Sequence, residues 1–263
     1  MTRRLAGGID VGSCTTKSVI VDDGGNILGS HVLYSGTDFE GASDTAWRET
    51  LSSVGVSSTD SICVFSTGYG RNSVSFATNS LTEISCHARG CLRYFPGPMT
   101  IVDIGGQDNK IIKLDQKGLR VSFKMNRKCA AGTGAFLEEM ALRLRLPLGK
   151  LNEIAKQADG EVILGSYCTV FSGTEVLEKI KSGAALDHIV RGLFHSVVKR
   201  ILEMDTFTDT VVMTGGVIEH NPFLIDLLKT HIPNDIVTPP HPQIMGALGA
   251  ALYALQEDPH NTD

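Results

Sequence analysis

The stretch GGIDVGSCTTKSVIVDDGGNIL, residues 7–28, returns in altered form as TIVDIGGQDNKIIKLDQKGLRV, residues 100–121. Each copy has an apolar run ending near an aspartate, a glycine-containing turn, a lysine, a second apolar run and an Asp and Gly turn. Asp10 matches Asp103, and Lys17 matches Lys110. Apolar runs separated by such turns are typical of β-hairpins. The repeat therefore predicts two similar domains, each directing its hairpin turn into a shared cleft.

The chemistry of the two turns suits a nucleoside triphosphate. Glycines let backbone N–H groups approach a phosphate closely. Asp10 and Asp103 would repel a bare phosphate, so a Mg²⁺ ion between acid and phosphate is expected. Gln107, at the tip of the second turn, is placed to orient an attacking water. The predicted phosphate contacts are Gly12, Ser13, Cys14, Thr15, Thr16 and Lys17 in the first turn, and Gly105, Gly106 and Asp108 in the second.

Two more glycine motifs lie near the C-terminus. In VVMTGGVIEHN, residues 211–221, a buried strand is expected to end at Gly215, Gly216 and Val217, where a bare backbone can lie against a base or ribose. In PQIMGALGAALYAL, residues 242–255, small residues from Gly246 onward begin a helix and permit close packing. Both motifs are predicted to contribute to the nucleotide site.

A cysteine precedes a third glycine-rich segment, KCAAGTGAFLEEM, residues 128–140. After Cys129 and the run Gly132, Thr133 and Gly134, helical spacing continues until Pro147. Glu138, in the first turns of this helix, is a candidate for a ribose hydroxyl contact, and a solvated acid near a helix start explains it equally well. Cys168 similarly precedes the helical stretch TVFSGTEVLEKIKSG.

Composition limits the classes of protein. The 263 residues carry a net charge of −5, so no basic footprint indicates nucleic acid as a partner. No segment approaches the roughly 18 apolar residues of a membrane span, and we expect a cytoplasmic protein. None of the six cysteines forms a CxxC pair, which excludes a one-chain zinc ribbon or bacterial ferredoxin motif.

The motifs also resemble a known family. The two hairpin turns, the TGG motif and the small-residue C-terminal helix are similar to the actin, sugar kinase and Hsp70 superfamily. In chain order, GGIDVGS, STGYGR, TEISCHARG, VDIGGQD, MNRKCAAGTG, YCTVF, VVMTGGV and GALGAALYA resemble the ATP-dependent activators of 2-hydroxyacyl-CoA dehydratases. That family includes the ATP-binding subunits of benzoyl-CoA reductase.

The resemblance implies an α/β fold of two RNase H-like domains with a nucleotide cleft between them. We place the first in residues 1–97 plus 244–258, and the second in residues 98–243. It further implies a homodimer with one [4Fe-4S] cluster, held by Cys129 and Cys168 of each subunit. ATP hydrolysis would drive an electron, received from a ferredoxin or flavodoxin, to an acceptor iron–sulfur enzyme of anaerobic metabolism. The residues agree, because a cubane needs four thiolates and helix N-termini favour an anionic cluster.

Some features leave alternatives open. Gly173 stands where the family commonly has an acidic residue, and Arg127 where an aspartate is usual, so the acceptor could be a double-cubane-cluster or benzoyl-CoA-reductase-like protein. A small-molecule kinase of the same fold with structural thiols, or a nucleotide-dependent sensor or chaperone, are further alternatives. For Cys86 and His87 a packing or cleft-support role is preferred to a metal or catalytic one. Arg71 is left unassigned.

Overall fold

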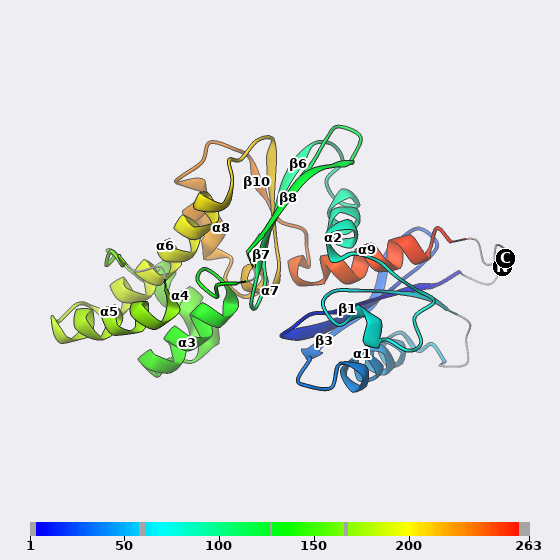
Figure 1. Cartoon of the computed structure of the whole chain (residues 1–263), viewed down its shortest axis with the longest axis horizontal. Coiled ribbons are helices and arrows are strands. Elements are labelled where there is room, and N and C mark those ends of the chain that lie inside the picture. The colour runs from blue at the N-terminus through cyan, green and yellow to red at the C-terminus, as the bar shows by residue number, and fades with distance from the viewer. Residues whose placement is uncertain (1–3, 58–61, 127, 166–167, 258–263) are drawn as a thin grey trace. The chain divides into compact units, whose positions relative to one another are not determined.

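The computed structural model describes residues 4–57, 62–126, 128–165 and 168–257. Contacts divide the chain into two compact units (Figure 1). Unit 1 comprises Met1–Gly97, Leu114–Arg120 and Ile244–Asp263, and unit 2 comprises Pro98–Lys113 and Val121–Gln243. Each unit contains a five-stranded sheet with helices packed on it, which confirms the predicted α/β class.

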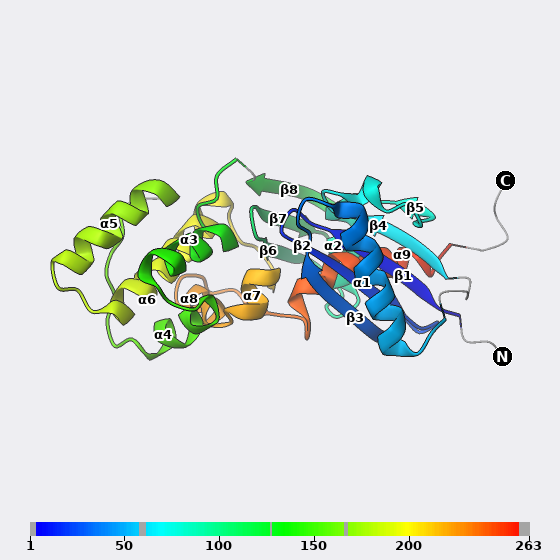
Figure 2. The same cartoon turned by 90° about the horizontal axis from the view of Figure 1, so that it is seen from below.

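Unit 1 is built on a sheet of strand order β3-β2-β1-β4-β5 (Figure 2). Strands β1 and β2 form the first predicted hairpin, in which Asp10 lies opposite Lys17. Helix α1 packs on β2 and β3, while α9 packs on β1 and α2. The elements are β1 (Ala6–Val11), β2 (Thr15–Val21), β3 (Ile27–Tyr34), α1 (Phe39–Val54), β4 (Cys63–Thr67), η1 (Arg71–Ser73), β5 (Asn79–Ser80), α2 (Glu83–Leu92) and α9 (Met245–Ala254).

Unit 2 has the corresponding strand order β10-β9-β6-β7-β8. Its core joins the sheet to apolar faces of α3, α4, α6 and α8. The elements are β6 (Met99–Ile104), β7 (Asn109–Leu114), β8 (Arg120–Asn126), α3 (Gly134–Leu144), η2 (Leu148–Lys150), α4 (Leu151–Gln157), α5 (Thr169–Lys181), α6 (Leu186–Met204), β9 (Thr210–Thr214), α7 (Gly216–His220), α8 (Phe223–Lys229), β10 (Ile236–Val237) and η3 (Pro242–Ile244).

The turns that follow the second strand of each hairpin repeat the same geometry. The Oδ1 atom of Asp22 accepts the backbone N–H groups of Gly24 and Asn26 at 3.0 and 2.8 Å. Asp115 Oδ1 accepts those of Lys117 and Leu119 at 2.8 and 2.9 Å. Gly25 and Gly118 occupy the left-handed region at φ 73° and 74°. Glycine adopts this conformation without the steric cost that other residues bear, so both turns require it.

The duplication extends beyond the hairpins to a parallel neighbour strand. In unit 1, β4 pairs with β1 and places Thr67 beside Asp10. In unit 2, β9 pairs with β6 and places Thr214 beside Asp103. Each strand is followed by a glycine at positive φ, Gly68 at 91° and Gly215 at 98°. The sequence comparison of residues 7–28 with 100–121 does not reach these positions.

The predicted helices form where the apolar spacing indicated them. The helix after the GTG run, α3, ends at Leu144 before Pro147, and the helical stretch predicted after Cys168 forms α5. Glycines in unit 1 bring backbones into contact: a Cβ on Gly249 of α9 would lie 1.7 Å from the carbonyl oxygen of Cys86 on α2. In the part of the chain that the structure describes, no helix combines the length and apolar character needed to cross a membrane.

Candidate functional site

Asp10 is a buried carboxylate at the end of β1, with one oxygen paired and one oxygen bare. Lys17 Nζ lies 3.2 Å from Asp10 Oδ2. Asp10 Oδ1 is buried and has no hydrogen-bond partner among the described residues. Two glycines enclose the carboxylate: a Cβ would lie 2.4 Å from Oδ1 at Gly68 and 2.9 Å from Oδ2 at Gly246. A buried, unpartnered carboxylate oxygen is costly, and a cation or an ordered water would satisfy it.

The turn after Asp10 closes through a hydrogen bond from the Gly12 N–H to the Thr15 carbonyl at 3.0 Å. Ser13 at its tip is exposed, and Cys14 and Thr15 are half-buried. Thr16 is buried, and its hydroxyl pairs with that of Ser35 at 2.9 Å. The side chain of Thr16 thus has a structural partner inside unit 1.

Asp103 is the equivalent residue of unit 2, at the end of β6, and both of its oxygens have partners. Lys110 Nζ lies 3.0 Å from Asp103 Oδ2, and the Thr214 hydroxyl donates to Asp103 Oδ1 at 3.2 Å. The same ammonium lies 2.9 Å from Asp108 Oδ2. Lys110 is only 2% exposed. A buried ammonium between two carboxylates offsets their charge and holds their orientation.

The turn between β6 and β7 is held closed from inside. The Gly105 N–H donates to the Asp108 carbonyl at 2.9 Å. A Cβ on Gly105 would lie 2.6 Å from Asp108 Oδ1, so the Asp108 carboxylate folds over the bare backbone. Gln107 is exposed at the tip of this turn.

The segment after Cys129 lies directly against this turn. The N–H groups of Gly134 and Ala135 donate to the carbonyls of Gly105 and Gly106 at 2.9 and 2.7 Å. A Cβ on Gly134 would lie 3.1 Å from Gly106 Cα and 3.3 Å from Val217 Cγ2. The GGQD, GTG and TGG motifs, distant in the sequence, therefore meet in unit 2.

The remaining predicted nucleotide contacts of unit 2 lie around these motifs. Gly215 carries a positive φ, and a Cβ there would lie 2.8 Å from Asp103 Oδ1. Gly216 begins α7, Val217 is buried, and Thr133 is buried as the N-cap of α3. Glu138 is exposed on α3.

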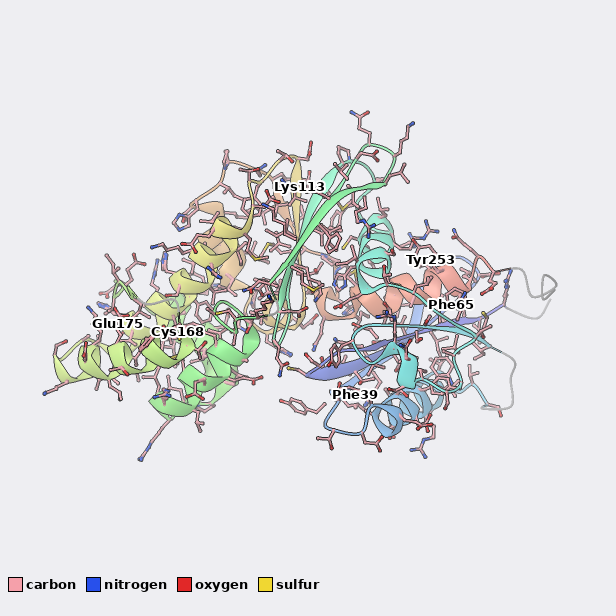
Figure 3. The ribbon with its side chains drawn as sticks, viewed as in Figure 1. Phe39, Phe65, Lys113, Cys168, Glu175 and Tyr253 are labelled. Atoms are coloured by element: carbon pink, nitrogen blue, oxygen red, sulfur yellow. The ribbon has the colours of Figure 1, made fainter. Side chains whose placement is uncertain are left out.

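The two candidate metal-binding cysteines both belong to unit 2. Cys129 is half-buried and lies between β8 and α3, where its carbonyl accepts Asn126 Nδ2 at 3.3 Å. Cys168 is exposed at the N-cap of α5 (Figure 3). Helix α5 packs against α3. Glu175 Oε1 on α5 accepts the Gly165 N–H at 2.7 Å, which anchors the chain ahead of Cys168.

The unassigned residues of the sequence have local partners in unit 1. Arg71 Nη1 donates to the Gly68 carbonyl at 3.2 Å, next to the Asp10 carboxylate. Cys86 and His87 are buried on α2. Burial raises the pKa of Cys86 to about 12, so its thiol stays protonated at neutral pH. A thiolate role for Cys86 is therefore disfavoured.

Sequence reasoning missed three contributors to this site. Thr214 and Gly68 lie outside the recognised repeat, and only the strand pairing shows that they occupy equivalent positions beside the two aspartates. Asn109 was overlooked although a polar amide before an apolar strand is a detectable signal. Its Nδ2 donates to the Gly132 carbonyl at 2.9 Å.

The α/β fold of the chain is shared with solved structures of sugar kinases. A ROK family glucokinase from Streptomyces griseus has the same fold, with a TM-score of 0.59 at 14% identity over 96% of this chain and 100% of the kinase chain. The chain belongs to the BadF/BadG/BcrA/BcrD ATPase family, which it matches over residues 8–254.

Some relatives that match almost the full length of the chain are named for their function. The chain is 40% identical to a 2-hydroxyisocaproyl-CoA dehydratase activator from Clostridioides difficile, over 95% of this chain and 94% of the relative. It is 37% identical to an (R)-2-hydroxyglutaryl-CoA dehydratase activating ATPase from Acidaminococcus fermentans, over 95% and 96%. A solved structure of the Clostridium difficile activator with bound ADPNP aligns with a TM-score of 0.88 at 38% identity, covering 95% of this chain and 94% of that one.

Proposed function

We propose that this protein is an ATP-dependent activator of an enzyme of the 2-hydroxyacyl-CoA dehydratase type, and that it delivers one electron at low potential. The observation that carries the proposal is the direct bonding of a predicted phosphate turn, Gly105–Asp108, to the segment that follows Cys129. An ATPase of this family thereby has a short route from nucleotide to thiol. The dehydratase as acceptor follows from the names of the relatives that match almost the full length.

The hairpin turn of each unit binds phosphate, and Asp10 binds the metal ion. The residues fit a Mg²⁺ ion, because Asp10 Oδ1 is buried and unpartnered in the described structure while carboxylate oxygens are preferred Mg²⁺ ligands. Mg²⁺ supplies charge neutralisation at the transferring phosphoryl group. Lys17 and backbone N–H groups of its turn bind phosphate, and Gln107 orients the water that converts ATP to ADP and phosphate.

Cys129 and Cys168 fit one half of a [4Fe-4S] site. They are two accessible or half-buried thiols of one unit, located at or near the start of two helices that pack together. A cubane takes four thiolates, so two chains are needed, and the bound cluster supplies one-electron chemistry at low potential. Backbone N–H groups at the beginning of α5 stabilise the negative charge on its thiolates.

Exposed apolar side chains around α3 and α5 support a homodimer and an acceptor surface. Phe171 is 68% exposed and Leu142 is 74% exposed, and Leu177 and Ile180 are also exposed. Apolar side chains gathered on one part of a surface are typical of protein–protein contacts. We propose that this region pairs two copies of the chain, and that a cytoplasmic ferredoxin or flavodoxin donates the electron that passes to the dehydratase.

The test is anoxic purification with iron and sulfide analysis, followed by mixing with a dehydratase. We expect four iron atoms per two chains, loss of iron in Cys129→Ser and Cys168→Ser, and retention of iron in Cys86→Ser. Reduction of the dehydratase should require both ATP and a reduced carrier. A colourless monomer that phosphorylates a small molecule would overturn the proposal in favour of a kinase.

A further inference from the structure

Three hydrogen bonds join residues 105–109 to the segment that follows Cys129, residues 130–135. Two of them run between backbones, from Gly134 and Ala135 to the carbonyls of Gly105 and Gly106. The two donors are the first residues of α3, so these bonds fix the start of the helix. The third runs from Asn109 Nδ2 to the Gly132 carbonyl at 2.9 Å, and it ends between Cys129 and the helix.

The side chain of Asn109 is energetically unfavourable at its buried position. It is the first residue of β7, it is fully buried, and its Oδ1 has no hydrogen-bond partner within the described residues. Burying an amide oxygen without a partner costs on the order of 1–3 kcal/mol, and leucine, which has the same branching and the same number of side-chain heavy atoms, does not bear that cost. Within the described part of the chain, the hydrogen bond from Asn109 Nδ2 to the Gly132 carbonyl is the interaction that offsets this cost.

The loop between Cys129 and α3 is tightly constrained at its other contacts. Gly132 has φ 78°, and a Cβ there would lie 2.9 Å from the Cβ and Cγ atoms of Arg200 on α6. The carbonyl of Ala130 accepts both the N–H and the hydroxyl of Thr133, at 3.1 and 2.6 Å. On the other side, Asn126 binds the Cys129 carbonyl. A rigid loop transmits a displacement at Gly132 to Cys129 rather than absorbing it.

We propose that Asn109 is the positioning residue that couples the nucleotide state of the Gly105–Asp108 turn to the position of Cys129. Asn109 follows Asp108 directly in the chain, and its neighbour Lys110 clamps Asp108 and Asp103. A shift of the turn on binding or losing a γ-phosphate moves the Asn109 amide, and the Gly132 carbonyl follows it. This inference rests on the proposed function for the identity of the ligand and of the thiol, and it assigns the link between them to one side chain.

The test measures the reactivity of Cys129 in full-length protein prepared without iron, so that its thiol is available to the reagent. Iodoacetamide alkylation is followed by peptide mass spectrometry, without nucleotide and with saturating Mg²⁺–ADP or Mg²⁺–ADPNP. Coupled sites typically influence one another by about 5- to 150-fold. We expect the alkylation rate of Cys129 to change at least about fivefold between nucleotide states in the wild type, and less than about twofold in Asn109→Leu. Cys168 in the same digests serves as an internal reference.

Two further variants separate coupling from folding. Asn109→Asp keeps the size and shape of the side chain but removes the donor, and it should also abolish the nucleotide response. Asn126→Ala removes the bond on the other side of Cys129, and it should change the basal rate while the nucleotide response remains. Circular dichroism and calorimetric nucleotide affinity are recorded for each. In the wild type, alkylation of Cys129 should also change the nucleotide affinity, because the modified and unmodified thiol would bias the same loop; the size of that change need not equal the change in alkylation rate, since reciprocity applies to binding free energies and not to rates.

The outcomes distinguish this inference from the proposed function. An unchanged nucleotide response in folded Asn109→Leu or Asn109→Asp, or no response in the wild type, overturns the role of Asn109. Absence of iron after anoxic purification overturns the cluster, and the alkylation ratio then still decides whether Asn109 links the turn to Cys129. Absence of calorimetric nucleotide binding by the wild type overturns both.

Discussion

The hairpins of unit 1 and unit 2 have the same backbone arrangement, but their buried aspartates, Asp10 and Asp103, have different hydrogen-bond and ion-pair partners. Asp10 has one lysine partner and one bare buried oxygen. Asp103 has a lysine on one oxygen and a threonine hydroxyl on the other, and its lysine holds a second carboxylate as well. The first site is left with an unsatisfied acceptor, whereas the acceptors described for the second are met from within the protein.

The two aspartates differ in their partners because the threonine beside each one donates its hydroxyl to a different acceptor. Thr67 and Thr214 occupy equivalent strand positions. Thr214 donates its hydroxyl to Asp103, but Thr67 donates to the carbonyl of Leu81 at 3.0 Å. Two copies of the same backbone can therefore leave one aspartate available for a cation and give the other a structural role. We propose that Asp10 has the metal role and Asp103 the anchoring role.

The largest effect should come from removing the lysines. Lys110→Met leaves the buried Asp103 and the half-buried Asp108 unneutralised, and breaking a buried ion pair on one side costs about 3–5 kcal/mol. Lys17→Met affects a single carboxylate, the buried Asp10, whose lysine partner is itself partly exposed, and the expected loss is about 1–3 kcal/mol. Urea unfolding followed by circular dichroism compares the two variants.

Adding Asp108→Asn to Lys110→Met is the control for that comparison. Removing one of the two carboxylates should recover part of the lost stability, because the uncompensated charge is reduced. Equal destabilisation by the two lysine variants, with no recovery in the double variant, would show that the second hairpin is not the more strongly clamped one.

An intermediate effect, and an equal one in both units, is expected at the glycines that the two copies share. A Cβ on Gly68 would lie 2.5 Å from the Val11 carbonyl oxygen, and a Cβ on Gly215 would lie 2.3 Å from that of Ile104. Both residues have a φ above 90°, and forcing alanine into such a conformation costs about 1–3 kcal/mol before any clash. Thermal denaturation of Gly68→Ala and Gly215→Ala checks this. A stable Gly215→Ala beside an unstable Gly68→Ala would break the equivalence of the two positions.

The smallest effect should come from the threonines. Thr214→Val removes the hydroxyl from Asp103 Oδ1 and makes the second site resemble the first, at a cost of about 1–2 kcal/mol. Thr67→Val removes a bond to a carbonyl oxygen and should leave metal binding unchanged. Measuring Mn²⁺ affinity in both variants sharpens the comparison, since Thr214→Val is expected to gain weak binding. A loss of Mn²⁺ affinity in Thr67→Val alone would argue against the assignment.

The two hairpins could be predicted from the sequence, whereas the different roles of Asp10 and Asp103 could not. Apolar runs, Asp and Gly turns and the repeated Asp10–Lys17 spacing were sufficient to predict the hairpins, because these signals are local. The partner of each threonine was not predictable, since it depends on where a carbonyl such as that of Leu81 lies after folding. The Asn109 bond to Gly132 likewise joins residues that only the packing of α3 brings together. The roles of Cys129 and Cys168 stay a prediction.

The central claim is that Asp10, and not Asp103, is the carboxylate that binds the nucleotide-associated metal. Electron paramagnetic resonance titration of Mn²⁺ into the ADP-saturated protein tests it in Asp10→Asn and Asp103→Asn, two substitutions of matched size. We predict at least about a tenfold loss of Mn²⁺ affinity in Asp10→Asn, equal to about 1.4 kcal/mol, and a change below about threefold in Asp103→Asn. An equal loss in both variants, or a loss confined to Asp103→Asn, would contradict the account.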